Sequence, residues 1–226
     1  LELGGNDAFI VTKSADVKRA AAAAVRHRFY NCGQVCTSAK RILVHESCED
    51  TFVAHAKDLI EQIQVGNGLL GSKMGPLNNK DQLVFVSNAV DNIVSRDEGT
   101  LVTGGERIEG KGYFYRPTLL RDVTPEVVSE EIFGPVMSVI PFRTDDEAIQ
   151  IANSTRYGLG SSVWTDRLAV AHKYADELKA GVVWVNKHLI LPPEMPFGGV
   201  GDSGFGRENG TDFIYEYTEA KSILFG

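Results

Sequence analysis

The sequence predicts an α/β fold with a mostly parallel sheet flanked by helices. Short apolar runs of strand character alternate with stretches of helical periodicity, which is typical of parallel sheets built from strand–helix–strand units. Hydrophobic residues make up 43% of the chain and charged residues 23%, the balance of an ordinary globular domain. A length of 226 residues suits one large domain, or one and a half.

The elements of the first half follow from local patterns. A short apolar strand is expected at residues 8–11. An Ala-rich helix is expected over 16–29, with Ser14 as its N-terminal cap. Residues 42–44 are typical of the next strand, and the apolar side chains of 48–64 repeat at the spacing of an amphipathic helix.

A Gly-rich connection over 66–76 leads to a second amphipathic helix over 81–96 and a strand beginning at Leu101. The second half continues as strand, helix, strand, helix and strand over 136–142, 145–153, 161–164, 168–178 and 182–185. The last stretch, 213–225, is strand-like, but no helix follows it. Because a lone exposed edge strand promotes aggregation, we expect the chain to form a homo-oligomer, either a homodimer or a homotetramer.

Charge and composition argue against several classes of protein. A net charge of −7 disfavours nucleic acid or an anionic membrane as a partner. No apolar run approaches the roughly 18 residues of a membrane span, and no signal peptide is visible, so a cytoplasmic location is expected. The chain opens on Leu1 without an initiator Met, and we interpret it as a fragment of a longer protein.

The three cysteines, Cys32, Cys36 and Cys48, are an odd number, which fits a reducing compartment better than a disulfide scaffold. Cys32 and Cys36 are close in sequence, but no second pair of Cys or His has zinc-site spacing, so no metal site is expected. Cys32 and Cys48 are interpreted as small buried hydrophobic residues.

Four segments carry the chemistry of the chain. They are Leu1-Glu2-Leu3-Gly4-Gly5, the run from Phe29 to Cys36 that ends in Gly33-Gln34-Val35-Cys36, Glu130-Glu131-Ile132-Phe133-Gly134-Pro135, and Pro196-Phe197-Gly198-Gly199 followed by Ser203-Gly204-Phe205-Gly206-Arg207-Glu208. Together, and in this order, they resemble the catalytic half of the NAD(P)-dependent aldehyde dehydrogenase family. The resemblance spans nearly the whole chain and implies the catalytic-domain fold of that family.

Taken alone, a cysteine in a Gly-containing loop is more often a buried, inert thiol. A thiol reacts as the thiolate, and backbone N–H donors beside the sulfur lower its pKa from about 8.5 and hold the oxyanion formed on attack. The resemblance implies that Cys36 attacks the aldehyde and that Glu2 activates the water that hydrolyses the resulting thioester. An apolar setting that raises the pKa of Glu2 would make it a better base, and Val35 and Phe197 are candidates to supply it.

The resemblance also implies the cofactor contacts. Glu131 matches the carboxylate that binds a ribose of NAD or NADP, and Phe133 matches the aromatic side chain beside that ribose and the nicotinamide. Leu3 and Gln82 are further candidates, although Phe85 stands where the family often has Lys. Glu208 matches a second carboxylate of the family. Its role is either to assist proton movement or to form an ion pair with a nearby Lys or Arg, and the two alternatives remain equal.

Substrate choice in the family depends on the residues beside the nucleophile and on the loop before Pro196. The expected contacts are apolar for the most part and comprise Val35, Thr37, Leu189, Leu191 and Phe197. Glu194 could attract the ammonium group of an aminoaldehyde, but a solvated carboxylate is preferred. His188 is expected to orient the loop by hydrogen bonding rather than to act as a base.

The run Gly199-Val200-Gly201-Asp202-Ser203-Gly204 fits a dinucleotide fingerprint, but it is rejected because prolines precede it and no helix follows. We expect residues 1–209 to form the catalytic domain and 210–226 an oligomerisation tail, with the nucleotide-binding domain absent. The alternatives to aldehyde oxidation are transfer of the acyl group to coenzyme A, which Glu2 disfavours, ester hydrolysis at Cys36, and a binding or structural role without catalysis.

Overall fold

The computed structural model describes all of residues 1–226 and contains one seven-stranded sheet. The strands are β1 (Ala8–Val11), β2 (Arg41–His45), β3 (Thr100–Thr103), β4 (Thr118–Arg121), β5 (Val136–Phe142), β6 (Gly160–Trp164) and β7 (Val182–Val185), in the order β3-β4-β5-β2-β1-β6-β7. Every neighbouring pair is parallel except β3 and β4. The prediction of an α/β fold with a mostly parallel sheet is therefore confirmed.

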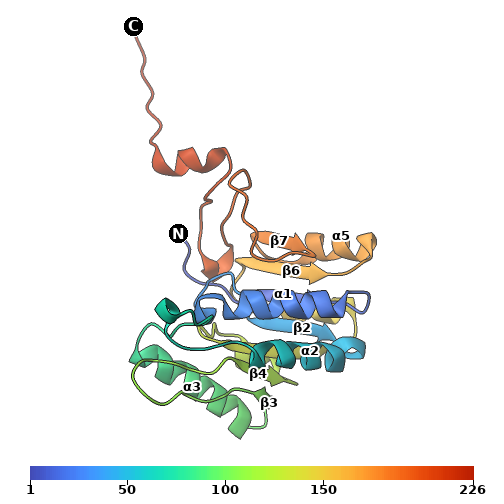
Figure 1. Cartoon of the computed structure of the whole chain (residues 1–226). Helices are drawn as coiled ribbons and strands as arrows, with labels where there is room; N and C mark the ends of the chain where they lie inside the picture. Colours follow the sequence, from blue (N-terminus) through green and yellow to red (C-terminus); the bar gives the residue numbers. More distant parts are fainter.

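Five helices flank the sheet: α1 (Val17–Phe29), α2 (Glu49–Glu61), α3 (Lys80–Ser95), α4 (Asp145–Ala152) and α5 (Leu168–Glu177). Helices α1 and α2 lie side by side over β2 and β4 in Figure 1. The central strands β1 and β2 are buried along almost their whole length, with no alternation of polar and apolar residues. Continuous apolar runs are expected where helices cover both faces of a parallel sheet.

The structure differs from the predicted elements at two places before the C-terminal tail. Asp16, not Ser14, caps α1: the Asp16 side chain accepts from the amide of Arg19, whereas the Ser14 hydroxyl bonds Thr165. The short strand β4 was not predicted, because its four residues directly follow Pro117 in an irregular stretch. Its central residues, Leu119 and Leu120, are fully buried, so pairing with β5 rather than local propensity fixes it.

The C-terminal tail differs most from the prediction. A 3₁₀ helix covers Asp212–Tyr217, and residues 218–226 form no strand. In Figure 1 this red segment projects away from the sheet. A strand needs a partner for its backbone N–H and C=O groups, and this chain offers none there. The irregular path of residues 199–204, which contain only a 3₁₀ turn at Gly201–Ser203, agrees with the rejection of the dinucleotide fingerprint.

No helix of the structure combines the length and the apolar character required to cross a bilayer.

Candidate active site

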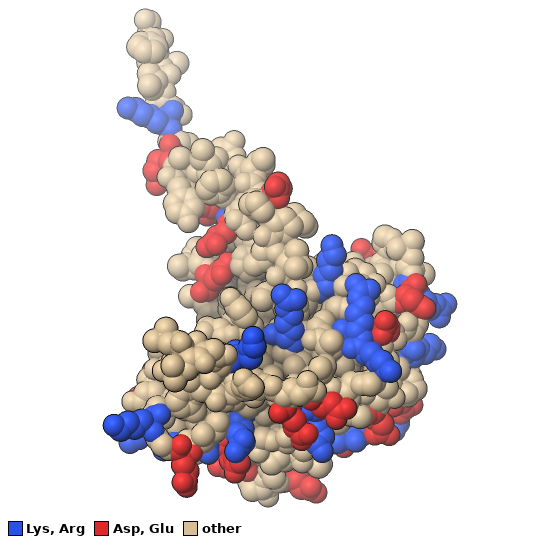
Figure 2. Space-filling model, viewed as in Figure 1, with Lys and Arg blue, Asp and Glu red and all other residues tan.

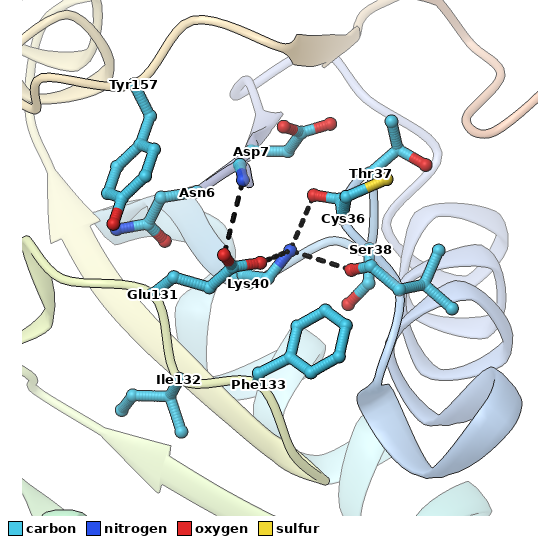
Figure 3. Close-up of polar contacts among 12 residues, drawn as sticks. Asn6, Asp7, Cys36, Thr37, Ser38, Lys40, Glu131, Ile132, Phe133 and Tyr157 are labelled. Carbon is cyan, nitrogen blue, oxygen red and sulfur yellow. Dashed lines mark hydrogen bonds and ion pairs between the residues drawn. The ribbon is translucent and has the colours of Figure 1, made fainter. Parts of the chain in front are cut away.

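The site lies at the edge where β1, β2 and β5 begin. Glu2 precedes β1, Cys36 precedes β2 and Glu131 precedes β5. Because these strands are parallel, their amino ends meet at one edge of the sheet, which brings together three motifs far apart in the sequence. Figure 3 shows the Cys36 loop (residues 31–38) and the Glu131 loop (residues 129–135) facing each other there.

The Cys36 loop begins with an unusual backbone. Asn31, Cys32 and Gly33 have φ values of 49°, 57° and 71°, in the left-handed region that non-glycine residues rarely enter. A Cβ atom on Gly33 would lie 2.2 Å from the carbonyl oxygen of Gly134. Glycine is therefore required at position 33, because the two loops pack backbone to backbone at that point.

Arg28, at the end of α1, forms hydrogen bonds with both of these loops. Its guanidinium is fully buried and donates to the carbonyl oxygens of Gly33, Ile132, Gly134 and Val136 and to the hydroxyl of Ser38. A guanidinium has five N–H donors in a rigid fork, and here the donors are used on backbone and hydroxyl acceptors. Arg28 thus fixes the spacing between the Cys36 loop and the Glu131 loop.

Cys36 itself is a free, half-buried thiol. Burial is the largest influence on its pKa and raises it; Lys40 and the amide of Thr37 oppose this, while the carboxylates of Glu2 and Asp7 add to it. The Cys36 amide donates to no backbone acceptor in the chain. That N–H is available to an oxyanion formed beside the sulfur.

Lys40 is the clearest functional candidate that the sequence did not reveal. Its buried ammonium lies 3.0 Å from Glu131 Oε1 and donates to the carbonyl oxygens of Val35 at 2.8 Å and Cys36 at 2.7 Å (Figure 3). The position precedes the apolar run of β2, where a lysine gives no motif signal. A charged residue directly before a buried strand was the only available hint.

Glu2 lies with the 196–208 loop rather than in a regular strand. Its backbone forms an isolated antiparallel bridge with Gly204, and Leu3 donates to Ser203 O at 3.0 Å. Glu2, Phe197 and Glu208 line one small cavity of about 60 Å³. Burial raises the pKa of Glu2, and the neighbouring charge of Glu208 raises it further. A carboxylate with a raised pKa is a better proton acceptor near neutral pH.

A second, open hollow of about 530 Å³ lies beside the Glu131 loop and is lined by Asn31, Gln34, Pro76, Leu77, Asn78, Gln82 and Phe133. The Gln82 amide donates to the Phe133 carbonyl at 2.7 Å. Gln82 therefore supports the backbone that presents Phe133. Leu3, the other candidate on this side, exposes 66% of its surface and does not line the hollow.

The comparisons with known proteins agree with this arrangement. The aldehyde dehydrogenase family model matches residues 1–223.

The chain belongs to the aldehyde dehydrogenase family.

Curated relatives of this aldehyde dehydrogenase chain include the mitochondrial aldehyde dehydrogenase of Leishmania tarentolae, 43% identical over 100% of this chain and 46% of the relative. The succinate-semialdehyde dehydrogenase [NADP(+)] of Mycobacterium avium is 40% identical over 100% of this chain and 48% of its own length. Among solved structures, a mutant aldehyde dehydrogenase of Bacillus cereus superposes with a TM-score of 0.94 at 39% identity, covering 99% of this chain and 46% of that one.

The betaine aldehyde dehydrogenase of Staphylococcus aureus, solved in complex with NAD⁺, gives a TM-score of 0.91 at 34% identity, over 96% of this chain and 44% of that one. This chain thus spans about half the length of the curated relatives that it matches. The matches cover the part of the family fold that contains the seven-stranded sheet described above.

The loop expected to contact substrate in this aldehyde dehydrogenase chain follows β7. Leu191 and Phe197 line a largely apolar cavity of about 260 Å³ together with Trp184, Ile190 and Met195. Leu189, Val35 and Thr37 do not line it, and Glu194 is exposed.

His188 lies beneath this loop and is buried. It shares hydrogen bonds with Ser162 Oγ at 3.0 Å and with the Thr37 carbonyl at 2.8 Å, so it ties the loop to the residue after Cys36. Burial lowers the pKa of His188 to about 3, which keeps the ring neutral at physiological pH. The expectation that His188 orients the loop by hydrogen bonds agrees with this geometry.

The other two cysteines lie apart from this chemistry. Cys32 and Cys48 are both buried, in agreement with their interpretation as small hydrophobic residues. Burial raises the pKa of Cys32 to about 12, so this thiol is unreactive at neutral pH. No group of three or more His, Cys, Asp or Glu side chains in the chain has an arrangement that could hold a metal ion.

Proposed function

We propose that the protein oxidises an aldehyde to a carboxylic acid with NAD or NADP, with Cys36 as nucleophile and Glu2 as general base. The observation that carries the proposal is the convergence of the two groups at one edge of the sheet. The charge of the Glu2 carboxylate raises the pKa of the Cys36 thiol, after the larger effect of burial. A thiol nucleophile with a carboxylate of raised pKa in reach provides both halves of covalent acyl chemistry.

In the first half-reaction, the Cys36 thiolate attacks the aldehyde carbon and forms a thiohemiacetal, whose oxyanion is stabilised by the Cys36 amide. NAD or NADP, when bound, would accept the hydride that departs from the thiohemiacetal carbon. A thioester would then remain on Cys36. In the second, Glu2 takes a proton from water, the resulting hydroxide attacks the thioester, and the acid departs as the Cys36 thiolate is released. Glu208 lines the same cavity, and we propose that it carries the proton from Glu2 to solvent.

The residues present fit a nicotinamide cofactor. Glu131 Oε1 is buried and forms an ion pair with Lys40 at 3.0 Å, and Oε2 accepts from the Gly5 amide at 3.4 Å. A carboxylate oxygen has two acceptor sites, so Oε2 keeps one for a ribose hydroxyl. Phe133, beside it, lines the open hollow. We propose that these two residues hold the nicotinamide half of the cofactor.

The test uses the natural protein, with any segments outside residues 1–226, and follows reduced nicotinamide during incubation with aldehydes. NAD and NADP are supplied separately with aliphatic, aromatic, amino- and carboxy-aldehydes. We expect turnover that Cys36→Ala abolishes and that Cys48→Ala, a matched change of a buried thiol, preserves. Wild-type protein inactive on the whole panel would overturn the proposal.

The panel also decides the substrate class. The apolar cavity lined by Leu191 and Phe197 favours aldehydes with an apolar chain. Glu194 is exposed and precedes Met195, a residue of the cavity lining, and a preference for aminoaldehydes that Glu194→Gln removes would assign it to substrate recognition. An unchanged preference would leave it as a solvated carboxylate.

Ester hydrolysis is the second candidate, because it requires only the thiol, the base and an oxyanion donor, all within this chain. Hydrolysis of an activated ester without cofactor, lost in Cys36→Ala, would establish it. It would stand as the main activity only if no aldehyde were oxidised.

A further inference from the structure

Lys40 contacts two segments of the site through its single buried ammonium group. An ammonium has three N–H donors. In this chain Lys40 donates to Val35 O and Cys36 O, at 2.8 and 2.7 Å, and forms an ion pair with Glu131 Oε1 at 3.0 Å. The first two acceptors belong to the Cys36 loop and the third to the Glu131 loop, so Lys40 is the only side chain that pairs the carbonyl of Cys36 with the Glu131 carboxylate.

Burial makes this arrangement specific. The Lys40 side chain exposes 3% of its surface and that of Glu131 exposes 15%, so their attraction is screened little by water. A buried ammonium is costly unless it is paired and hydrogen-bonded. Glu131 is held from its other side by Gly5, where an added Cβ would lie 2.5 Å from Cys36 O. The carboxylate and the Cys36 carbonyl are thereby fixed relative to each other.

We propose that Lys40 is a positioning residue that couples the Glu131 carboxylate to the reactivity of Cys36. Its charge stabilises the Cys36 thiolate, and Glu131 moderates that effect by neutralising Lys40. Its hydrogen bonds fix the Cys36 carbonyl, and its ion pair fixes the Glu131 carboxylate. The inference rests on the proposed function only for the identity of the group that Glu131 binds.

Other charged groups face Lys40 and Glu131 and are present in every variant; because Asp7, with a pKa of about 7, changes its own charge within the pH range of the test, the profiles are compared between variants at the same pH. Besides Lys40 and Glu131, the charged groups are Glu2 and Asp7 from the segment before β1, Arg28 from α1 and Arg41 at the start of β2. Glu2 and Asp7 raise the pKa of Cys36, whereas Lys40 lowers it. Since only Lys40 and Glu131 change between variants, a change in the thiol pKa reports on that pair.

The decisive measurement is the rate of Cys36 alkylation by iodoacetamide against pH, without cofactor, in the natural protein. We expect Lys40→Met to raise the apparent thiol pKa by about half a unit or more and Glu131→Gln to lower it, because the two changes remove charges of opposite sign. Lys40→Arg should restore most of the wild-type profile. Lys57→Met, an exposed lysine paired with Glu61 on α2, is the control and should leave the profile unchanged.

Opposite shifts of the thiol pKa in Lys40→Met and Glu131→Gln would support the coupling. A lysine with only a structural role would not give shifts of opposite sign in these two variants. Shifts of the same sign, or no shift in Glu131→Gln, would overturn it. Should Lys40→Met fail to fold, the direction of the Glu131→Gln shift together with the Lys40→Arg profile decides the question.

Cofactor binding separates this inference from the proposed function. We expect Lys40→Met to weaken binding of NAD or NADP about tenfold or more, because Glu131 loses the partner that orients it. Wild-type protein that binds neither cofactor but shows the opposite alkylation shifts would contradict the proposed function and leave the coupling intact. Wild-type turnover combined with alkylation profiles that the variants do not alter would contradict the coupling and leave the proposed function intact.

Discussion

Cys36 lies among charges of both signs, and their balance decides how readily its thiol ionises. Lys40 and the Thr37 amide favour the thiolate, whereas burial, Glu2 and Asp7 oppose it. Sequence motifs pointed to Cys36 and Glu2, because those residues lie in recognisable segments. They could not point to Lys40 or Arg28, whose roles depend on groups distant in the sequence: the Glu131 carboxylate for Lys40 and the Gly134 carbonyl for Arg28.

The charge of Glu208 acts on Glu2, the proposed general base. The pKa of Glu2 is raised by burial and then by the charge of Glu208, so Glu208→Gln should lower it. In a pH–rate profile, the acidic limb should move to lower pH, by about half a unit. Exposed Glu219→Gln in the tail is the control. An unmoved acidic limb would show that Glu208 does not act on Glu2, and a fall in kcat at all pH values would favour a proton-relay role.

Asp7 makes stability depend on pH. Burial raises its pKa from 3.8 to about 7, its Oδ1 accepts from Gly160 and its Oδ2 has no partner. An acid whose folded-state pKa is raised contributes stability that is present below the unfolded pKa and is lost as pH rises toward the folded pKa. The contribution of Asp7 is thus lost between about pH 4 and pH 7.

Asp7→Asn should therefore gain stability relative to wild type as pH rises. Urea unfolding at about pH 5 and about pH 8 should show a difference that grows by at most about 3 kcal/mol, the equivalent of roughly two pKa units, because the first of the roughly three units lies below pH 5. The Gly160 amide keeps an oxygen acceptor in the variant, which limits other losses. The same difference at both pH values would contradict the assignment.

Helix α1 contributes to the site through its last turn, where Arg28 joins two loops. Arg28→Met would leave several buried acceptors without donors, so we expect a loss of about 3 kcal/mol or more in unfolding free energy. Arg26→Met, an exposed arginine two residues earlier, should cost almost nothing. The comparison is made by chemical denaturation, and equal losses in the two variants would refute the role assigned to Arg28.

Helices and long apolar strands were predictable from the sequence because periodicity and burial agree locally, as in β1 and α3. The predictions failed where a neighbour decides the conformation. Strand β4 is fixed by β5 and the core, not by its own four residues. The tail was expected to be a strand from its apolar residues, but without a partner its first part forms a 3₁₀ helix.

At the scale of the whole molecule, the tail is the segment whose side chains stay exposed in a single chain. Figure 2 shows Lys and Arg intermingled with Asp and Glu over the body, whereas the tip of the tail is almost uncharged. Ile223, Leu224 and Phe225 expose 66%, 97% and 89% of their surfaces. Apolar side chains exposed to this extent mark an interaction surface. We propose that residues 1–209 are the catalytic domain and that 210–226 mediate a homodimer or homotetramer.

Removal of residues 218–226 should therefore reduce the oligomer to smaller species while the body keeps its fold. Sedimentation velocity of the natural protein and its truncated form measures the first effect, and circular dichroism the second. The triple change of Ile223, Leu224 and Phe225 to Ser tests the apolar contacts alone. An unchanged sedimentation coefficient in both variants would exclude the tail from assembly.

The most direct test of the central claim is to trap the acyl group on Cys36. If Glu2 activates the hydrolytic water, Glu2→Gln still forms the thioester but releases it slowly. The natural protein carrying Glu2→Gln would be mixed with NAD or NADP and a substrate aldehyde, quenched in acid and digested for peptide mass spectrometry. The account predicts an acyl adduct on Cys36 that is absent without cofactor and absent in the wild type at steady state. No adduct, or an adduct on another residue, would contradict it.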